Sequence, residues 1–115
     1  MELKFYKDGE KVFASYEELD LEKLEVGVVD AAREKHIPEV SVNGNQVNVQ
    51  VGSVIHPMLE NHYITFILLE TDKGLLQQDL KPGQEPVATF VLEDGVKPLA
   101  AYEHCNLHGV WKKEL

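Results

Sequence analysis

A chain of 115 residues is long enough for one domain with a modest hydrophobic core. Its composition, 43% hydrophobic and 27% charged, is that of an ordinary soluble globular protein and excludes a disordered or fibrous chain. Twenty acidic against eleven basic residues give a formal charge of −9, which argues against nucleic acid or an anionic membrane surface as a partner.

The N-terminal residues 1–4 lack the apolar core of a signal peptide. The longest apolar stretch, residues 63–69, is far too short to span a bilayer as a helix. We therefore expect a cytoplasmic protein that does not insert into a membrane.

The first third of the chain differs in pattern from the rest. Ser15-Tyr16-Glu17-Glu18 has the form of a capping box, which predicts a short helix through Leu24. Residues 30–33 predict a single helical turn. We expect residues 1–30 to form an appendage, a short hairpin plus a helical turn, beside a main domain of residues 31–115.

From residue 40 onward the sequence predicts short strands. Residues 40–42 and 46–51 alternate apolar and polar side chains on either side of Asn43-Gly44, a strong hairpin signal. Residues 63–70, 75–80, 87–92 and 99–104 predict further strands, the first three of them ending at turn residues. Strands at such regular spacing, without a long helical pattern between them, predict an antiparallel β-sandwich or barrel.

Four histidines and the only cysteine fall beside these strands. His56 and His62 lie between two predicted strands, and Cys105 and His108 form a Cys-x-x-His motif after the last one. His36 lies beside a proline in a short charged segment upstream. Loops at one end of a sandwich can gather distant ligands, and a thiolate with imidazoles suits zinc, copper or iron rather than calcium or magnesium.

The number of candidate ligands discriminates among these metals. Structural zinc closes at four ligands, whereas four imidazoles and one thiolate make five and leave a sixth position open. This arrangement favours iron with a small exchangeable ligand. A thiolate opposite that position pushes electron density through the metal, so the sequence predicts redox chemistry on oxygen, superoxide or peroxide.

Each residue on its own also has a structural explanation. A histidine beside a proline is more often structural than a ligand, and a lone cysteine near a C-terminal strand is usually part of a core. Trp111 is expected to be a packing residue, and His104, directly before the cysteine, is expected to face away from the site. Only the combination of the histidines with Cys105 favours a metal site.

Three segments together resemble a known family. Residues 34–38, 56–63 and 105–112 are similar to the iron-site motifs of the superoxide reductases, the desulfoferrodoxin and neelaredoxin family, in order and approximate spacing. The resemblance extends from residue 34 to residue 115. It implies an immunoglobulin-like β-sandwich that carries one non-haem iron and reduces superoxide by one electron to hydrogen peroxide.

The resemblance also implies a role for each site residue. The implied iron ligands are His36, His56, His62 and His108 in a plane, with Cys105 on the axis. Glu34 corresponds to a carboxylate that can occupy the sixth position in the oxidised state. Lys35 corresponds to a lysine beside the open face, where its positive charge would steer superoxide toward an acidic protein.

The chain departs from the larger family members near its N-terminus. Residues 4–7 and 29–32 resemble the ends of the small rubredoxin-like domain of two-iron members, but the four cysteines expected there are missing. We therefore expect one iron, an external electron donor such as rubredoxin, and the dimer or tetramer that the family implies.

Two alternatives from other functional classes stay open. The chain is also consistent with a zinc-loaded structural or interaction module that uses four of the five ligands. An iron electron-transfer protein without superoxide turnover is the second alternative. A hydrolase is disfavoured, because the sequence has no Gly-x-Ser-x-Gly elbow and no phosphate-binding glycine loop.

Overall fold

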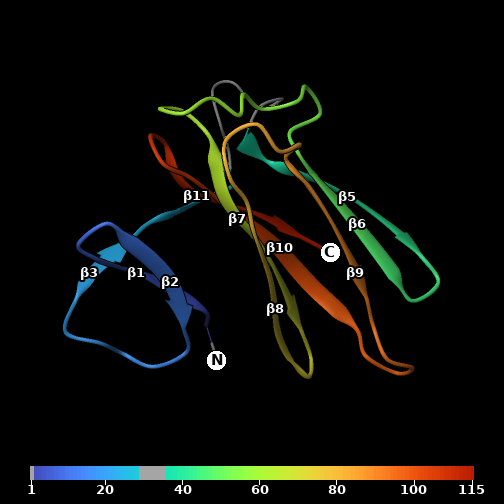
Figure 1. The fold of residues 1–115 in the computed structure, drawn as a ribbon. Coiled ribbons are helices and arrows are strands. Elements are labelled where there is room, and N and C mark those ends of the chain that lie inside the picture. Colours follow the sequence, from blue (N-terminus) through green and yellow to red (C-terminus); the bar gives the residue numbers. More distant parts are fainter. Residues whose placement is uncertain (1, 29–35) are drawn as a thin grey trace.

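A computed structural model describes residues 2–28 and 36–115, which form eleven β-strands (Figure 1). The strands are β1 (Lys4–Asp8), β2 (Lys11–Ser15), β3 (Glu22–Leu24), β4 (Val26–Gly27), β5 (Pro38–Asn43), β6 (Gln46–Val51), β7 (Ile64–Thr71), β8 (Gly74–Asp79), β9 (Val87–Val91), β10 (Pro98–Cys105) and β11 (Gly109–Glu114). No helix in these two stretches is long and apolar enough to cross a membrane.

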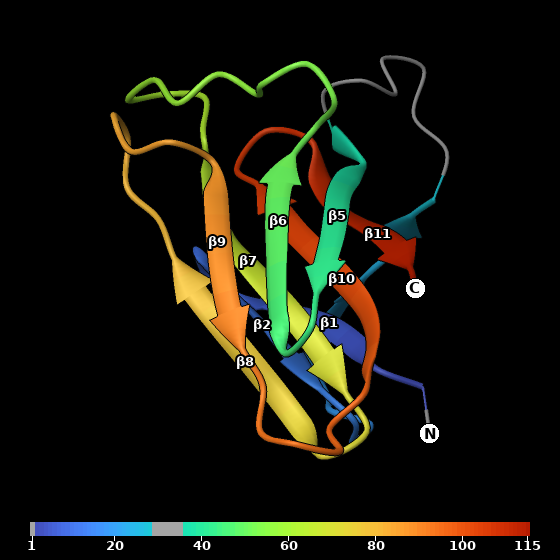
Figure 2. The same ribbon diagram turned by 90° about the vertical axis from the view of Figure 1, so that its right-hand side faces the viewer.

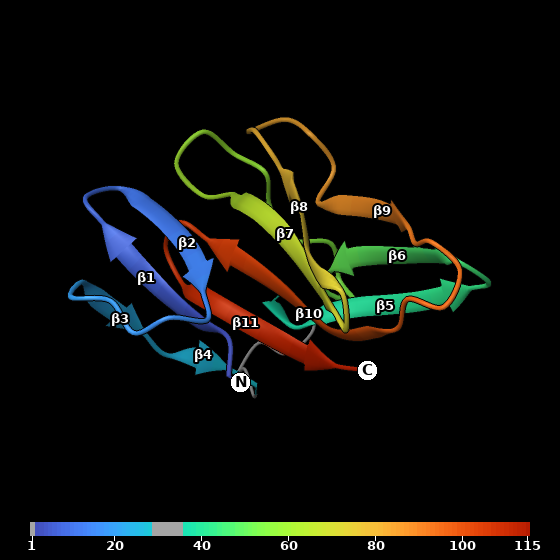
Figure 3. The ribbon, with the colours of Figure 1, turned by 90° about the horizontal axis from the view of Figure 1, so that it is seen from below.

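Three sheets lie in successive layers (Figure 3). A five-stranded sheet of order β4-β11-β10-β7-β8 faces a three-stranded sheet of order β5-β6-β9. The third sheet, of order β2-β1-β3, comes from the N-terminal residues and covers the other face of the five-stranded sheet. Strand pairs are antiparallel except for β4 with β11. The predicted all-β sandwich is confirmed.

Two hydrophobic cores separate the three layers. The first core lies inside the sandwich and includes Val47 and Val49 of β6 and Ile67 and Leu69 of β7. The second core lies between the five-stranded sheet and the N-terminal sheet. Strand β7 is buried on both faces, which explains why its sequence is a nearly continuous apolar run instead of an alternating one.

The N-terminal sheet is tied to the sandwich by aromatic side chains. Phe5 is fully buried, with ring centroids 5.0 Å from Tyr102 and 6.4 Å from Phe66. The hydroxyl groups of Tyr16 and Tyr102 donate hydrogen bonds of 2.7 and 3.0 Å to the two carboxylate oxygens of Glu70. Residues of the N-terminal sheet therefore share a core and a polar network with β7 and β10.

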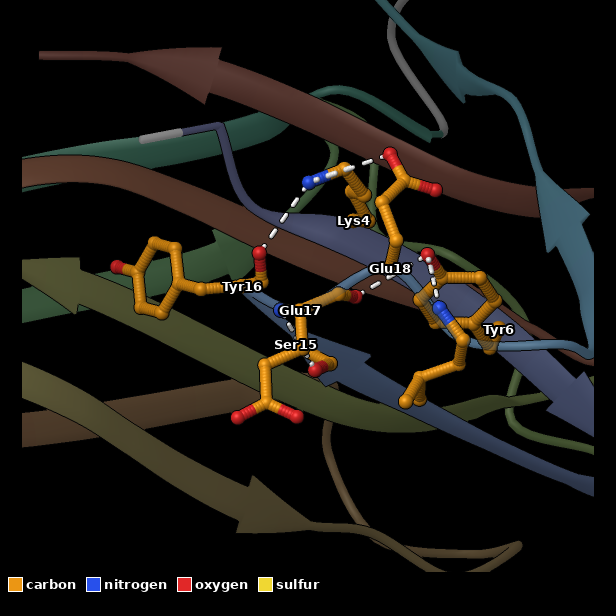
Figure 4. Close-up of polar contacts among 7 residues, drawn as sticks. Lys4, Tyr6, Ser15, Tyr16, Glu17 and Glu18 are labelled. Atoms are coloured by element: carbon orange, nitrogen blue, oxygen red, sulfur yellow. Dashed lines mark hydrogen bonds and ion pairs between the residues drawn. The ribbon is translucent and has the colours of Figure 1, made fainter.

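The short helix predicted for residues 15–24 is wrong, because side chains of β1 hold this segment in an extended path (Figure 4). The Tyr6 hydroxyl donates to the Glu17 carbonyl and accepts from the Leu19 N–H, both at 3.2 Å. Ser15 Oγ accepts from the N–H of Glu17, two residues on, in a local turn. The two contacts of Tyr6 use backbone groups that a helix would pair internally, and β3 then pairs with β1.

The strands predicted from residue 40 onward are all present, but the first hairpin turns one residue later than expected. Asn43 pairs with Gln46, so the two-residue loop is Gly44-Asn45, and Gly44 has the positive φ of 62° that glycine tolerates best. Strand β11 was not predicted. The helical turn predicted at residues 30–33 lies outside the described residues.

Candidate metal centre

The five predicted metal ligands converge at one end of the sandwich, where β6 and β10 end and β5, β7 and β11 begin (Figure 2). Antiparallel strands return to the same end, so residues distant in the sequence meet there. One nitrogen or sulfur atom from each residue lies within 4.8 Å of those of all the others. The five residues are His36, His56, His62, Cys105 and His108.

The four imidazole rings form a closed circuit. The ring of His36 lies 5.1 Å from that of His56 and 4.8 Å from that of His108, measured between centroids. The ring of His62 lies 4.8 Å from that of His56 and 5.0 Å from that of His108. Each ring therefore has two ring neighbours, as four nitrogen ligands arranged around one central ion would have.

The nitrogen spacing fits a single ion. A metal–nitrogen bond in a protein is about 2.0–2.1 Å long, so two nitrogens at a right angle around one ion lie about 3 Å apart. His36 Nε2 and His108 Nδ1 are 3.2 Å apart. In the absence of an ion, one of these nitrogens must carry a proton to make this contact a hydrogen bond; around an ion, both present lone pairs.

His56 is already in the protonation state that a ligand needs. Its Nδ1 lies 2.8 Å from the carbonyl oxygen of Pro57 and donates to it, which leaves Nε2 as the lone-pair nitrogen. The pKa of His56 falls to about 4, chiefly through burial and further through the charges of the other three imidazoles, against the effect of the Pro57 carbonyl. Nε2 is buried without a hydrogen-bond partner among the described residues, a costly arrangement that a bound cation would relieve.

Cys105 occupies the buried side of the cluster. Its side chain is fully buried, and Sγ lies 3.6 Å from His108 Nδ1. Burial raises the pKa of the thiol, whereas hydrogen bonds from the backbone N–H groups of Leu107 and His108 favour the thiolate and lower it. Cys105, His36 and His56 are buried, whereas His62 is half-buried and His108 is exposed, so the cluster reaches solvent at His108 and not at the sulfur.

A β-bulge aims the beginning of β7 at the cluster. Cys105 pairs with Ile64, and His104 pairs with Phe66, so Thr65 is the extra residue on β7. The bulge changes the alternation of the strand, which turns Ile64 into the first core beside Cys105 while Phe66 faces the second core. His62 stands two residues before this point.

Asn106 joins the loop that carries His56 and His62 to the turn that carries Cys105 and His108. Its side chain accepts a 2.9 Å hydrogen bond from the Tyr63 N–H and donates one of 3.1 Å to the Asn61 carbonyl. Its backbone N–H donates to the Tyr63 carbonyl at 3.1 Å. These bonds fix the position of His62 relative to the Cys105–His108 turn, which the sequence pattern did not indicate.

Trp111, expected from the sequence to be a packing residue, also touches the cluster directly. Its indole stacks on the ring of His36, with centroids 5.1 Å apart and planes 11° apart. Its Nε1–H donates a 2.9 Å hydrogen bond to the carbonyl oxygen of His108. The sequence feature that could have indicated this contact is the position of Trp111, three residues after His108.

His104 lies away from the cluster, as expected. Its Nδ1 is 2.6 Å from the Thr65 hydroxyl, and its ring stacks on Phe66 on the side of the second core. Burial, followed by the charge of Lys7, lowers its pKa to about 4. The two other predicted site residues, Glu34 and Lys35, lie outside the described residues.

Four imidazoles and a thiolate form a donor set for a transition metal, because nitrogen and sulfur ligands suit zinc, copper and iron. Five donors in this arrangement exceed the four of a structural zinc site. The cluster therefore fits a transition-metal ion, with His108 at its solvent-exposed edge.

Comparisons with known proteins agree with this geometry. The sequence model of the Desulfoferrodoxin family matches residues 28–114. A desulfoferrodoxin from Desulfarculus baarsii is 44% identical over 95 residues, which cover 83% of this chain and 74% of that protein. A desulfoferrodoxin homologue from Archaeoglobus fulgidus is 46% identical over 90 residues, covering 77% of this chain and 70% of that protein.

Two solved structures show the same similarity in three dimensions. The superoxide reductase of Treponema pallidum superposes with a TM-score of 0.87 and 41% identity, over 99% of this chain and 100% of that one. A one-iron superoxide reductase from Giardia intestinalis superposes with a TM-score of 0.59 and 41% identity, over 71% of this chain and 99% of that one. Of these two proteins, only the former matches this chain over nearly its whole length.

Proposed function

This chain belongs to the desulfoferrodoxin family, and we propose that it is a superoxide reductase. The reaction adds one electron and two protons to superoxide and yields hydrogen peroxide, without forming oxygen. The observation that carries the proposal is the closed circuit of four imidazoles beside a buried thiol. Relatives and structural neighbours that are named superoxide reductases support it.

We propose that the five clustered residues hold one iron ion. Iron bound there would supply the electron by cycling between its ferrous and ferric forms. His56 contributes a neutral imidazole whose Nε2 lone pair is not used elsewhere. Cys105 must lose its proton to bind, and the N–H groups of Leu107 and His108 stabilise the resulting thiolate. Because the sulfur takes the buried side, superoxide would bind on the solvent-facing side.

We propose roles for Glu34 and Lys35 from the family resemblance. Lys35 would attract the superoxide anion to a chain whose formal charge is −9, and Glu34 would supply a carboxylate to the open position after oxidation. Lys35→Glu should slow the bimolecular reaction with superoxide and leave the iron content unchanged. A rate that is unaltered at low ionic strength, where steering is strongest, would reject the role of Lys35.

The first test is a visible absorption spectrum of protein purified without added metal, before and after mild oxidation, with metal analysis of the same sample. The proposal predicts stoichiometric iron and a thiolate-to-iron charge-transfer band that Cys105→Ser abolishes and His104→Ala preserves. After a superoxide pulse, the reduced protein should form one hydrogen peroxide per superoxide and no oxygen. A colourless protein that holds zinc even after iron reconstitution would favour a structural module, and an iron centre inert to superoxide would favour electron transfer.

We also propose four further features of the working protein. Electrons would come from an external donor such as rubredoxin, the protein would form a dimer or tetramer, and it would act in the cytoplasm. Residues 1–30 would form an appendage without iron beside the iron-binding domain of residues 31–115. Sedimentation at micromolar concentration tests the assembly, and reduction of the oxidised protein by reduced rubredoxin tests the donor.

A further inference from the structure

The indole of Trp111 is held at three points, and one of them lies in the N-terminal part of the chain. It stacks on His36 and donates its N–H to the carbonyl of His108, so it contacts two of the proposed ligands. Its six-membered ring also lies against Gly27 of β4. Trp111 and Gly27 are directly paired in the parallel β4–β11 ladder.

The contact with Gly27 leaves no room for a side chain. A Cβ atom added to Gly27 would lie 2.4 Å from Cε3 and 2.5 Å from Cζ3 of Trp111, well inside van der Waals contact. Gly27 does not have the positive φ seen at Gly9, Gly44 and other turn glycines. Glycine is therefore required at this position for space and not for its conformational freedom.

Because the indole of Trp111 is rigid and planar, a shift of the ring at one contact also moves it at the other two. If a side chain at residue 27 pushes the indole of Trp111, the ring cannot keep both its stack on His36 and its hydrogen bond to the His108 carbonyl. The position of β4 is itself set by the second core, against which Val26 packs, and by the pairing of Val26 with Val110. The packing of residues 2–28 is thus connected to the metal centre through one side chain.

We propose that Gly27 and Trp111 are positioning residues, through which the N-terminal segment holds His36 and His108 in the arrangement that binds the metal. The inference rests on the proposed metal centre and assigns a task to a segment that has no cysteine. Groups that orient metal ligands typically contribute 10- to 100-fold to metal affinity. We expect Gly27→Ala to reduce affinity by about 10-fold and Trp111→Phe, which keeps an aromatic ring but loses the N–H, by a similar factor.

The test compares iron retention against a chelator and the visible band of the oxidised protein in the wild type, Gly27→Ala and Trp111→Phe. Leu24→Ala is the matched control, because Leu24 packs on the second core from β3 in the N-terminal sheet, whereas Gly27 and Trp111 pair within the five-stranded sheet. The control should lower the melting temperature while the band and the iron affinity stay as in the wild type. Gly27→Ala should shift the band and release iron faster.

Fluorescence gives an independent readout, because Trp111 is the only tryptophan of the chain. Metal binding to His36 should change its emission in the wild type, and Gly27→Ala should alter the emission of the metal-free protein. Zinc serves as a second probe ion, so the coupling is measurable even if the native metal is not iron. If the wild type binds a metal but Gly27→Ala has the same emission, affinity and band, the inference is wrong; if the wild type binds no metal, the proposed function is wrong.

Discussion

The two cores of this protein lie on opposite faces of strands β7 and β10 and have different roles. The first core is aliphatic apart from Phe90 and ends at Cys105, beneath the candidate centre. The second core is rich in aromatic residues and joins the N-terminal sheet to β7 and β10. Strand β10 therefore presents Cys105 to the first core and Tyr102 to the second, and its adjacent residues Ala101 and Tyr102 belong to different environments.

The largest expected effect comes from emptying the second core. Phe5 is fully buried between Phe66 and Tyr102, so Phe5→Ala should lower the free energy of unfolding by about 3–5 kcal/mol. The matched change in the first core, Ile67→Ala, should cost about 2–5 kcal/mol. Chemical denaturation followed by far-UV circular dichroism measures both.

The shape of the transition decides how separate the two cores are. If the cores form one cooperative unit, both variants unfold in a single transition that is moved to lower denaturant. If residues 2–28 are an independent appendage, Phe5→Ala instead gives an early partial transition, and the sandwich unfolds at the midpoint of the wild type.

A smaller effect is expected where the two loops of the centre are tied together. Asn106→Ala removes two side-chain hydrogen bonds to the backbone of residues 61 and 63, each of which contributes about 1 kcal/mol. Because His62 lies between these residues, iron should be retained less tightly. Metal analysis after dialysis against a chelator measures the loss.

Asn45→Ala is the matched control for this loop variant. Asn45 also makes an exposed side-chain hydrogen bond, 2.7 Å to Asp94, but it lies in the first hairpin turn, at the other end of β6 from His56. The Asn45→Ala variant should keep its iron. Equal iron loss in both variants would mean that Asn106 does not position His62.

The sequence predicted those features that depend on local patterns. The hairpin at Gly44 follows from turn chemistry, and the Cys105–His108 spacing identifies residues that share one turn. The path of residues 15–19 was not predictable locally, because its backbone is paired by Tyr6, a side chain far away along the chain. The task of Trp111 likewise depends on its contact with Gly27, which only the tertiary structure creates.

The Glu70 network should make the second core sensitive to alkali. Burial and the hydrogen bond to Glu70 raise the pKa of Tyr16 to about 12, and the pKa of Tyr102 is raised by the same causes. The unfolded phenols ionise near pH 10, so above that value the folded state holds more protons and stability falls as pH rises. Tyr16→Phe should cost about 1 kcal/mol at neutral pH and make this alkaline loss less steep. If the free energy of unfolding depends on pH equally in the wild type and in Tyr16→Phe, Tyr16 does not contribute to the alkaline loss of stability.

The smallest expected effect on the metal centre is that of changing His104, the residue next to Cys105. Successive side chains of a strand point to opposite faces, so Cys105 enters the first core while His104 turns toward Thr65 and Phe66 on the second. His104→Ala should keep the iron content and the charge-transfer band while slightly lowering stability through the lost contacts. If His104→Ala loses as much iron as His108→Ala, His104 and not one of the four clustered histidines would be a ligand. That result would contradict the alternation of β10, which places Cys105 on the side of the cluster and its neighbour His104 on the other side.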